Sequence, residues 1–148
     1  MDKDIEKNAS YYPNSHVVKM ITEFNQILSS AHYFTDDIPK NIYKLTHKNH
    51  PASLWARESL SNWLWLKEMN KALSKEYTYR YNRIHKGEIY LDSLPVPKIK
   101  DIGLTPFKEI MPEKYITGSI VEDYRNYFLN EKAHLLKWKR REKPFWVK

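Results

Sequence analysis

The chain has no cysteine, only three glycines and no long run of hydrophobic residues. Without cysteine it has no disulfide, thiolate metal site or cysteine nucleophile, so we expect a reducing, cytoplasmic setting. Three glycines are too few for the glycine-rich phosphate loops of kinases, GTPases and dinucleotide-binding proteins. No segment reaches the roughly 20 apolar residues of a membrane-spanning helix, and the polar start does not match a signal peptide. We therefore expect no membrane partner.

Positive charge and aromatic rings are what the chain has in excess. Its 148 residues carry a formal net charge of +7, and 14% of them are aromatic. A basic balance of this size favours a polyanionic partner, with DNA expected first and a free nucleotide as the other possibility. The length is that of one domain with its own core. No motif indicates a cofactor, and the sequence does not define an oligomeric state.

Apolar residues recur at helical spacing along most of the chain, and no strand pattern competes with them. The periodicity predicts helices over 16–32, from Pro51 to a break near Ser59, on to Tyr81, over 88–94, and from a capping box at Ser119 and Glu122 to about 140. Residues 1–15 show no periodicity and are predicted to form an arm. Residues 16–148 are predicted to form a single all-α domain, a compact helical bundle.

Four prolines and two glycines interrupt the pattern over residues 95–118. We expect irregular chain that covers the helices before the last helix begins, since its apolar residues need burial. These residues are Ile99, Ile102, Leu104, Phe107, Ile110 and Met111.

A polar stripe on the first predicted helix contains His16, Lys19 and Glu23 at i, i+3 and i+7. A carboxylate beside an amine and an imidazole is suited to general acid–base catalysis or to imine formation on a sugar. The alternative is a solvated helix face on which Lys19 and Glu23 form an ordinary i, i+4 pair.

The helix that starts at Pro51 carries a second set of candidates. His47, Lys48 and His50 precede it, and their cations and the free N–H groups of a helix start suit an anion such as phosphate. The alternatives are a metal site, for which H-x-x-H alone is a weak signal, and a simple helix cap.

Arginines and aromatic rings are interleaved downstream, a combination that holds bases by stacking and phosphates by a guanidinium fork. The expected phosphate ligands here are Arg57, Arg80 and Arg83, and the expected stacking rings are Trp55, Trp65 and Tyr81. The alternatives are that Trp63 and Tyr77 belong to the core and that Glu76 and Arg80 form an ordinary pair.

The C-terminal segment mixes basic and aromatic residues, which is typical of a nucleic-acid surface. The candidate phosphate contacts are Arg125, Lys132, Lys139, Arg140 and Arg141. The alternative is a solvated helix end whose cations complement the helix dipole.

Four blocks resemble a group of small phage proteins of uncharacterised function, and they cover most of residues 16–148. They read H-V-V-K-M, H-K-N-H-P-A-S-L-W-A-R-E-S, E-Y-T-Y-R-Y and Y-R-N-Y-F-L-N-E-K-A-H-L-L-K-W. More distantly, the layout is similar to the pyrimidine-dimer DNA glycosylases of the phage endonuclease V type. The likeness rests on the order of the elements, the spacing of His16 and Glu23, and the basic, aromatic tail.

This second resemblance implies base excision followed by strand cleavage at the abasic site. In that family the N-terminal α-amine forms an imine with the sugar while a glutamate stabilises it and moves protons, a role that falls to Glu23. In this chain Asp2 normally blocks removal of Met1, and the polar arm does not match the start of the family. Either Lys19 is the nucleophile or the glycosylase chemistry is absent.

Two hypotheses follow. The first is a DNA-binding, DNA glycosylase/AP-lyase-like enzyme that acts on a damaged or modified pyrimidine in DNA repair. In it, the first helix, the 47–58 segment and the 76–83 face form one cleft. The second is a non-catalytic phage protein, located in the host cell, that binds nucleic acid or a small nucleotide or blocks a host protein.

Overall fold

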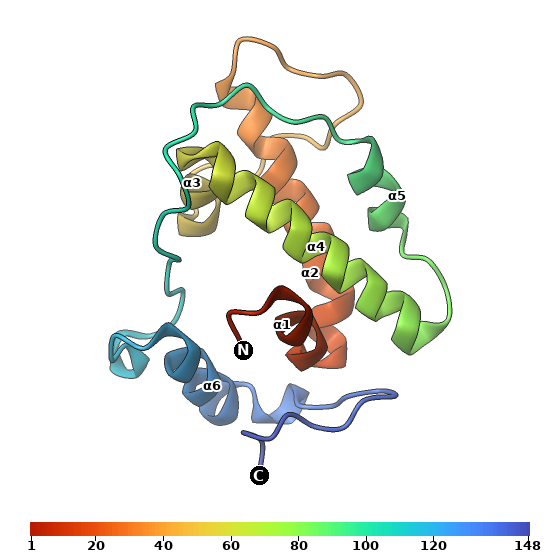
Figure 1. The fold of residues 1–148 in the computed structure, drawn as a ribbon, viewed down its shortest axis with the longest axis vertical. Helices are drawn as coiled ribbons and strands as arrows, with labels where there is room; N and C mark the ends of the chain where they lie inside the picture. Colours follow the sequence, from red (N-terminus) through yellow and green to blue (C-terminus); the bar gives the residue numbers. More distant parts are fainter.

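Six α-helices and three short 3₁₀ helices make up the computed structural model, which describes residues 1–148 and has no strand, as the periodicity predicted (Figure 1). The α-helices are α1 (Ile5–Tyr11), α2 (Asn14–Ala31), α3 (Pro51–Glu58), α4 (Leu60–Tyr81), α5 (Lys86–Ser93) and α6 (Ile120–Glu131). The 3₁₀ helices are η1 (His32–Phe34), η2 (Glu113–Tyr115) and η3 (Ala133–Leu135). The break at Ser59 is confirmed. None of the helices combines the length and apolar character needed to cross a membrane.

The core lies where α4 crosses α2, with α1, α3 and α5 packed around the crossing (Figure 1). Ile21 and Leu28 of α2 are fully buried, as are Trp63 and Leu73 of α4. Burying one such aliphatic side chain contributes about 1.5–3 kcal/mol. The Nε1 of Trp63 donates a hydrogen bond to the carbonyl of Leu28 at 3.0 Å, so this tryptophan is a core residue.

A buried amide network joins three helices inside this core. Asn70 of α4 donates to the side-chain oxygen of Asn25 in α2 at 2.8 Å, and Asn25 donates to the carbonyl of Gly87 in α5 at 2.8 Å. α4 ends at Tyr81, as predicted, and the next residue, Asn82, has a left-handed backbone (φ 52°) that stops the helix. The absence of a side chain at Gly87 lets α5 approach α2 closely.

The predicted N-terminal arm contains helix α1. The carboxylate of Asp4 accepts a hydrogen bond from the backbone N–H of Lys7 and caps this helix, which packs against α4. Periodicity failed here because seven residues make only two turns, too few to define a stripe. The segment is therefore part of the packed structure.

The last helix differs from the prediction at both ends. Ser119 makes no side-chain capping bond; instead the buried Asp123 accepts hydrogen bonds from the backbone N–H groups of Thr117 and Gly118. These bonds, with the Thr117 hydroxyl as the largest cause, hold the pKa of Asp123 below its usual value. α6 stops at Glu131, and residues 136–148 continue as irregular chain. Helical spacing alone had extended the helix to residue 140.

Residues 95–118 are irregular apart from η2, as predicted. Ile99 and Phe107 pack against the core, but Ile102 and Leu104 are 57% and 53% exposed. The expectation that all the apolar residues of this segment are buried is therefore wrong.

Candidate functional site

A cavity of about 440 Å³ lies between the core helices and the later part of the chain. Helices α1, α2, α3 and α4 form one wall, and residues 107–110 and α6 form the other. Most of the lining side chains are hydrophobic. Its size is that of ordinary small-ligand pockets, which combine an apolar lining with a few polar groups.

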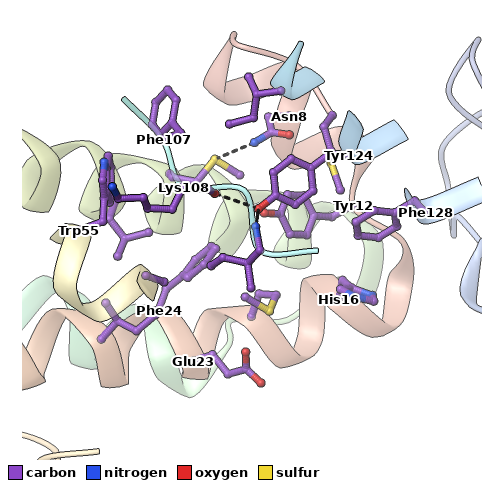
Figure 2. Close-up of a pocket in the computed structure, with 18 of the residues that line it drawn as sticks. Asn8, Tyr12, His16, Glu23, Phe24, Trp55, Phe107, Lys108, Tyr124 and Phe128 are labelled. Carbon is purple, nitrogen blue, oxygen red and sulfur yellow. Dashed lines mark hydrogen bonds between the residues drawn. The ribbon is translucent and has the colours of Figure 1, made fainter. Parts of the chain in front are cut away.

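The stripe predicted on α2 contributes polar groups to this cavity, since His16, Lys19 and Glu23 all line it. Lys19 Nζ lies 3.2 Å from Glu23 Oε1, and their side chains are 64% and 36% exposed, so this ion pair is at the rim. Figure 2 shows the Glu23 carboxylate at the edge of the group of lining side chains. Burial, followed by the charges of Lys19 and Lys132, lowers the pKa of His16. Its imidazole is therefore a neutral base near pH 7.

Met1 also lines the cavity and is 8% exposed, although residues 1–15 were predicted to form an arm. Burial, and then the positive charge of Arg125, lowers the pKa of the Met1 α-amino group to about 5. The amine is uncharged at neutral pH, and an uncharged amine has the lone pair that attacks a carbon atom. Lys19, in contrast, forms an ion pair with Glu23.

Arg125 holds the start of the chain in this position and does not serve as a free phosphate ligand. Its Nε donates to the carbonyl of Met1 at 3.1 Å, and its other nitrogens lie 3.7 Å from Asp2 and 2.8 Å from Glu122. The side chain is only 12% exposed. Arg125, which the sequence predicted as a phosphate contact, is therefore engaged with groups of the protein itself.

Aromatic rings surround the cavity, but only partly those that the sequence indicated. Trp55 and Trp65 line it and pack edge to face at 6.0 Å, together with Phe107. Trp55 is 6% exposed, so little of its ring is free for stacking. Tyr81 does not line the cavity and lies instead against Tyr77. Of the three predicted stacking rings, Tyr81 is therefore the one that lies away from the cavity.

Several lining rings were not predicted, since they come from α1, α6 and the irregular segment. Figure 2 shows them with Phe24: Tyr12, Phe107, Tyr124 and Phe128. The hydroxyl of Tyr124 accepts a hydrogen bond from the N–H of Ile110 at 3.1 Å and donates to the carbonyl of Lys108 at 3.2 Å. Burial raises the pKa of Tyr12 well above its usual value, so its hydroxyl stays protonated. No sequence spacing links these rings.

The predicted cations divide into three groups. His50 and Lys132 line the cavity, together with Lys3 and Lys108, which the sequence did not indicate. His47 and Lys48 lie in the loop before α3, next to His50, and the side chain of Arg57, near the end of α3, reaches back to Lys48. The remaining six do not line the cavity, namely Arg80, Arg83, Arg125, Lys139, Arg140 and Arg141.

Arg80 belongs to the protein interior, so its predicted phosphate contact is wrong. Its side chain is 0% exposed, and its Nε donates to Glu76 at 2.7 Å. The other nitrogens of Arg80 donate to the carbonyls of Tyr12 and Ser10. The 76–83 face therefore does not join the first helix and the 47–58 segment in one cleft.

The C-terminal tail, residues 136–148, packs against the end of α1 and the end of α4 (Figure 1). Arg141 donates two hydrogen bonds to Glu76, at 3.0 and 2.9 Å, and Arg140 donates to the carbonyl of Tyr79 at 3.1 Å. The indole N–H of Trp138 donates to the carbonyl of Tyr11 at 3.2 Å. Several basic and aromatic side chains of the tail therefore attach it to the rest of the protein.

No group of three or more His, Cys, Asp or Glu side chains is arranged to hold a metal ion. His50 instead acts as the alternative helix cap, since its Nδ1 accepts a hydrogen bond from the N–H of Ala52 at 3.1 Å. Comparisons with family models, with curated proteins and with solved structures find no match to this chain.

Proposed function

We propose that this chain is a DNA glycosylase with AP-lyase activity that receives an unstacked pyrimidine nucleotide in the cavity. The observation that carries the proposal is the convergence of an uncharged amine at Met1, the imidazole of His16 and the carboxylate of Glu23 on one apolar pocket. Enzymes that act on a base within DNA extrude it into such a pocket, because the target atom is out of reach in the duplex.

The proposed reaction begins at the amine. The nitrogen of Met1 attacks C1′ of the deoxyribose, and the bond between C1′ and the base breaks, with its electron pair leaving on the base. His16 takes the proton that the attacking nitrogen loses and passes it to the departing base. The sugar ring then opens, its oxygen takes a second amine proton, and the nitrogen forms an imine with C1′.

Glu23 acts on the imine in this scheme. A carboxylate near C1′ stabilises the positive charge there, and it accepts a proton from C2′. Loss of that proton leads to β-elimination, in which the C3′–O bond breaks and the 3′ phosphate leaves. Water then hydrolyses the imine and restores the free amine.

Lys19 is the second amine that lines the cavity, and it would carry out the same reaction after its ion pair with Glu23 opens. We favour Met1, because its amine is uncharged without such a rearrangement. The lysines at the cavity, among them Lys3, Lys108 and Lys132, supply positive charge for the surrounding strand.

Borohydride trapping tests this proposal, since borohydride reduces an imine to a stable amine bond. The full chain is mixed with labelled duplexes that carry a pyrimidine dimer, an abasic site or no lesion. We expect a covalent adduct with the abasic duplex and with the dimer duplex, and none with intact DNA. Peptide mapping by mass spectrometry then distinguishes Met1 from Lys19.

Two controls make the result specific. Acetylation of the Met1 amine should abolish trapping if Met1 is the nucleophile, whereas Lys19→Arg should leave trapping in place. No adduct on any duplex, with tight binding to all three, would contradict the enzyme proposal and leave a non-catalytic nucleic-acid binder. No adduct and no binding would assign the positive charge to another partner.

A further inference from the structure

Two cations lie against one aromatic ring beside the cavity. The guanidinium carbon of Arg57 is 3.9 Å from the centre of the Phe34 ring, and Lys48 Nζ is 5.9 Å from the same centre. Arg57 Nη1 donates to the carbonyl of Lys48 at 2.7 Å, which joins the two residues directly. We call Phe34, Lys48, His50 and Arg57 the Arg57 cluster.

Neither cation has a carboxylate partner within 4.0 Å, in contrast to Arg80, Arg125 and Arg141. Like charges held together without a counter-ion repel each other, and burial lowers the pKa of Arg57, so its charge is also partly desolvated. An anion placed between the two cations would relieve both costs. The guanidinium retains several N–H donors for it, since one nitrogen alone is engaged.

His50 connects this cluster to the cavity. Its Nδ1 accepts the N–H of Ala52, so the neutral ring carries its proton on Nε2 and presents a donor there. His50 also lines the cavity, as do Ala52 and Trp55 on the same helix. The Arg57 cluster and the cavity therefore share His50.

We infer that the Arg57 cluster is a phosphate-binding site for the nucleotide whose base enters the cavity, with Arg57 and Lys48 as its cationic ligands and His50 as a donor between phosphate and base. The identity of the neighbouring base rests on the proposed function, whereas the binding of an anion by this cluster does not. Guanidinium groups bind phosphate by paired, charge-assisted hydrogen bonds, and the flat contact with Phe34 keeps the Arg57 fork oriented. The phosphate belongs either to a DNA strand or to a free nucleotide.

Titrations with two ligands test the site and separate these sources. Fluorescence anisotropy measures binding of a labelled duplex with a reduced, unreactive abasic site, over a range of salt concentrations. Tryptophan fluorescence, to which Trp55 contributes, measures binding of thymidine monophosphate. The variants are Arg57→Gln, Lys48→Gln and Arg57→Lys, with Lys75→Gln as the control. Lys75 is exposed on α4 and has no salt bridge, so it matches the loss of charge.

For a DNA strand, Arg57→Gln and Lys48→Gln should each weaken duplex binding about 10-fold or more. Each should also make the slope of log K against log salt shallower by about 0.9, the value for one lost phosphate contact. Arg57→Lys should keep the salt slope but recover only part of the affinity, because an ammonium lacks the fork. For a free nucleotide, the same losses appear with thymidine monophosphate and not with the duplex.

The inference is overturned if both glutamine variants bind both ligands as the unaltered protein does. It is equally overturned if Lys75→Gln causes the same loss, since the effect would then be one of net charge. Lys48 is exposed, so Lys48→Gln should remain folded. If Arg57→Gln fails to fold, Lys48→Gln still tests the site. Imine trapping is scored separately: its absence contradicts the enzyme proposal, while a selective loss of phosphate binding still supports this site.

Discussion

The Nε of Arg125 donates a hydrogen bond to the carbonyl oxygen of Met1 at 3.1 Å and so joins α6 to the first residue of the chain. The same guanidinium is, after burial, the largest cause of the low pKa of the Met1 amine. One side chain of α6 therefore holds the proposed nucleophile in place and adds to the effect of burial on its pKa.

Replacement of Arg125 by Ala should move the pH profile of imine trapping to higher pH. Without the guanidinium, the pKa of the Met1 amine rises from about 5 towards its ordinary 8.0, so a smaller fraction is uncharged near pH 7. The check is the trapping rate against pH, with Arg125→Lys expected to restore much of the original profile. A rate that falls equally at every pH would indicate that Arg125 only stabilises the fold.

Glu23→Gln should slow strand cleavage at an abasic site by about 100-fold or more, the usual contribution of a general acid or base, while imine trapping and DNA affinity are kept. Glu68→Gln is a matched control, since Glu68 also forms an exposed helical ion pair, with Lys71. Strand-cleavage kinetics, borohydride trapping and anisotropy measure the three quantities. Unchanged strand cleavage in Glu23→Gln would remove this carboxylate from the mechanism.

The free energy of unfolding should rise with pH between about 5 and 8. The unfolded chain binds a proton at the Met1 amine below about pH 8, whereas the folded chain binds it only below about pH 5. Between these values the unfolded state holds more protons, so raising the pH favours the folded state. The gain is at most about 4 kcal/mol, at about 1.4 kcal/mol for each pKa unit.

Urea denaturation at several pH values measures this dependence. The pKa values of His16, His32 and His85 are also lowered, chiefly by burial, so below about pH 6.5 they too make the free energy of unfolding rise with pH. Protein acetylated at the Met1 amine should lose the part between pH 6.5 and 8. If acetylation leaves the pH dependence as it was, the amine is not buried in the folded state.

Glu76→Gln should destabilise the protein strongly, by about 3–5 kcal/mol, because it leaves the fully buried guanidinium of Arg80 without its counter-ion. Arg141→Ala should lower the free energy of unfolding much less, by about 1 kcal/mol. Arg141 is 39% exposed, and without it Glu76 still forms its ion pair with Arg80. Burial raises the pKa of Glu76, but hydrogen bonds from Arg141 and Arg80 outweigh it and hold the pKa below its usual value. Urea unfolding of both variants is the measurement, and equal losses would contradict this ranking.

Gly87→Ala should destabilise the fold by about 1–3 kcal/mol, the usual cost of overpacking. An added Cβ would lie 2.6 Å from a methyl carbon of Ile21 and 2.9 Å from the Asn25 amide nitrogen. The neighbouring exposed Lys86 offers a control, since Lys86→Ala should change the melting temperature little. A stable Gly87→Ala protein would mean that α5 does not lie this close to α2.

Much of the fold followed from the sequence because its signals are local. The period of apolar residues defined α2 and α4, and Pro51 marked the start of α3. The same period predicted a last helix longer than α6 and did not predict α1. The spacing of neighbouring residues contains no information on which distant segment they contact. The stripe of His16, Lys19 and Glu23 was visible for the same reason: three residues on one helix face share a surface wherever that helix packs.

The sequence by itself determined an all-α chain, a basic surface and one polar stripe with acid–base side chains. Only the tertiary structure decided what each cation does, since burial and pairing depend on segments far apart in the chain. Glu76 and Arg141 are 65 residues apart, and Met1 and Arg125 are 124 apart. Arg80 and Arg57 are the same residue type, yet the first is buried on a carboxylate and the second has none. That difference in desolvation and counter-ions separates a structural arginine from one free to bind an anion.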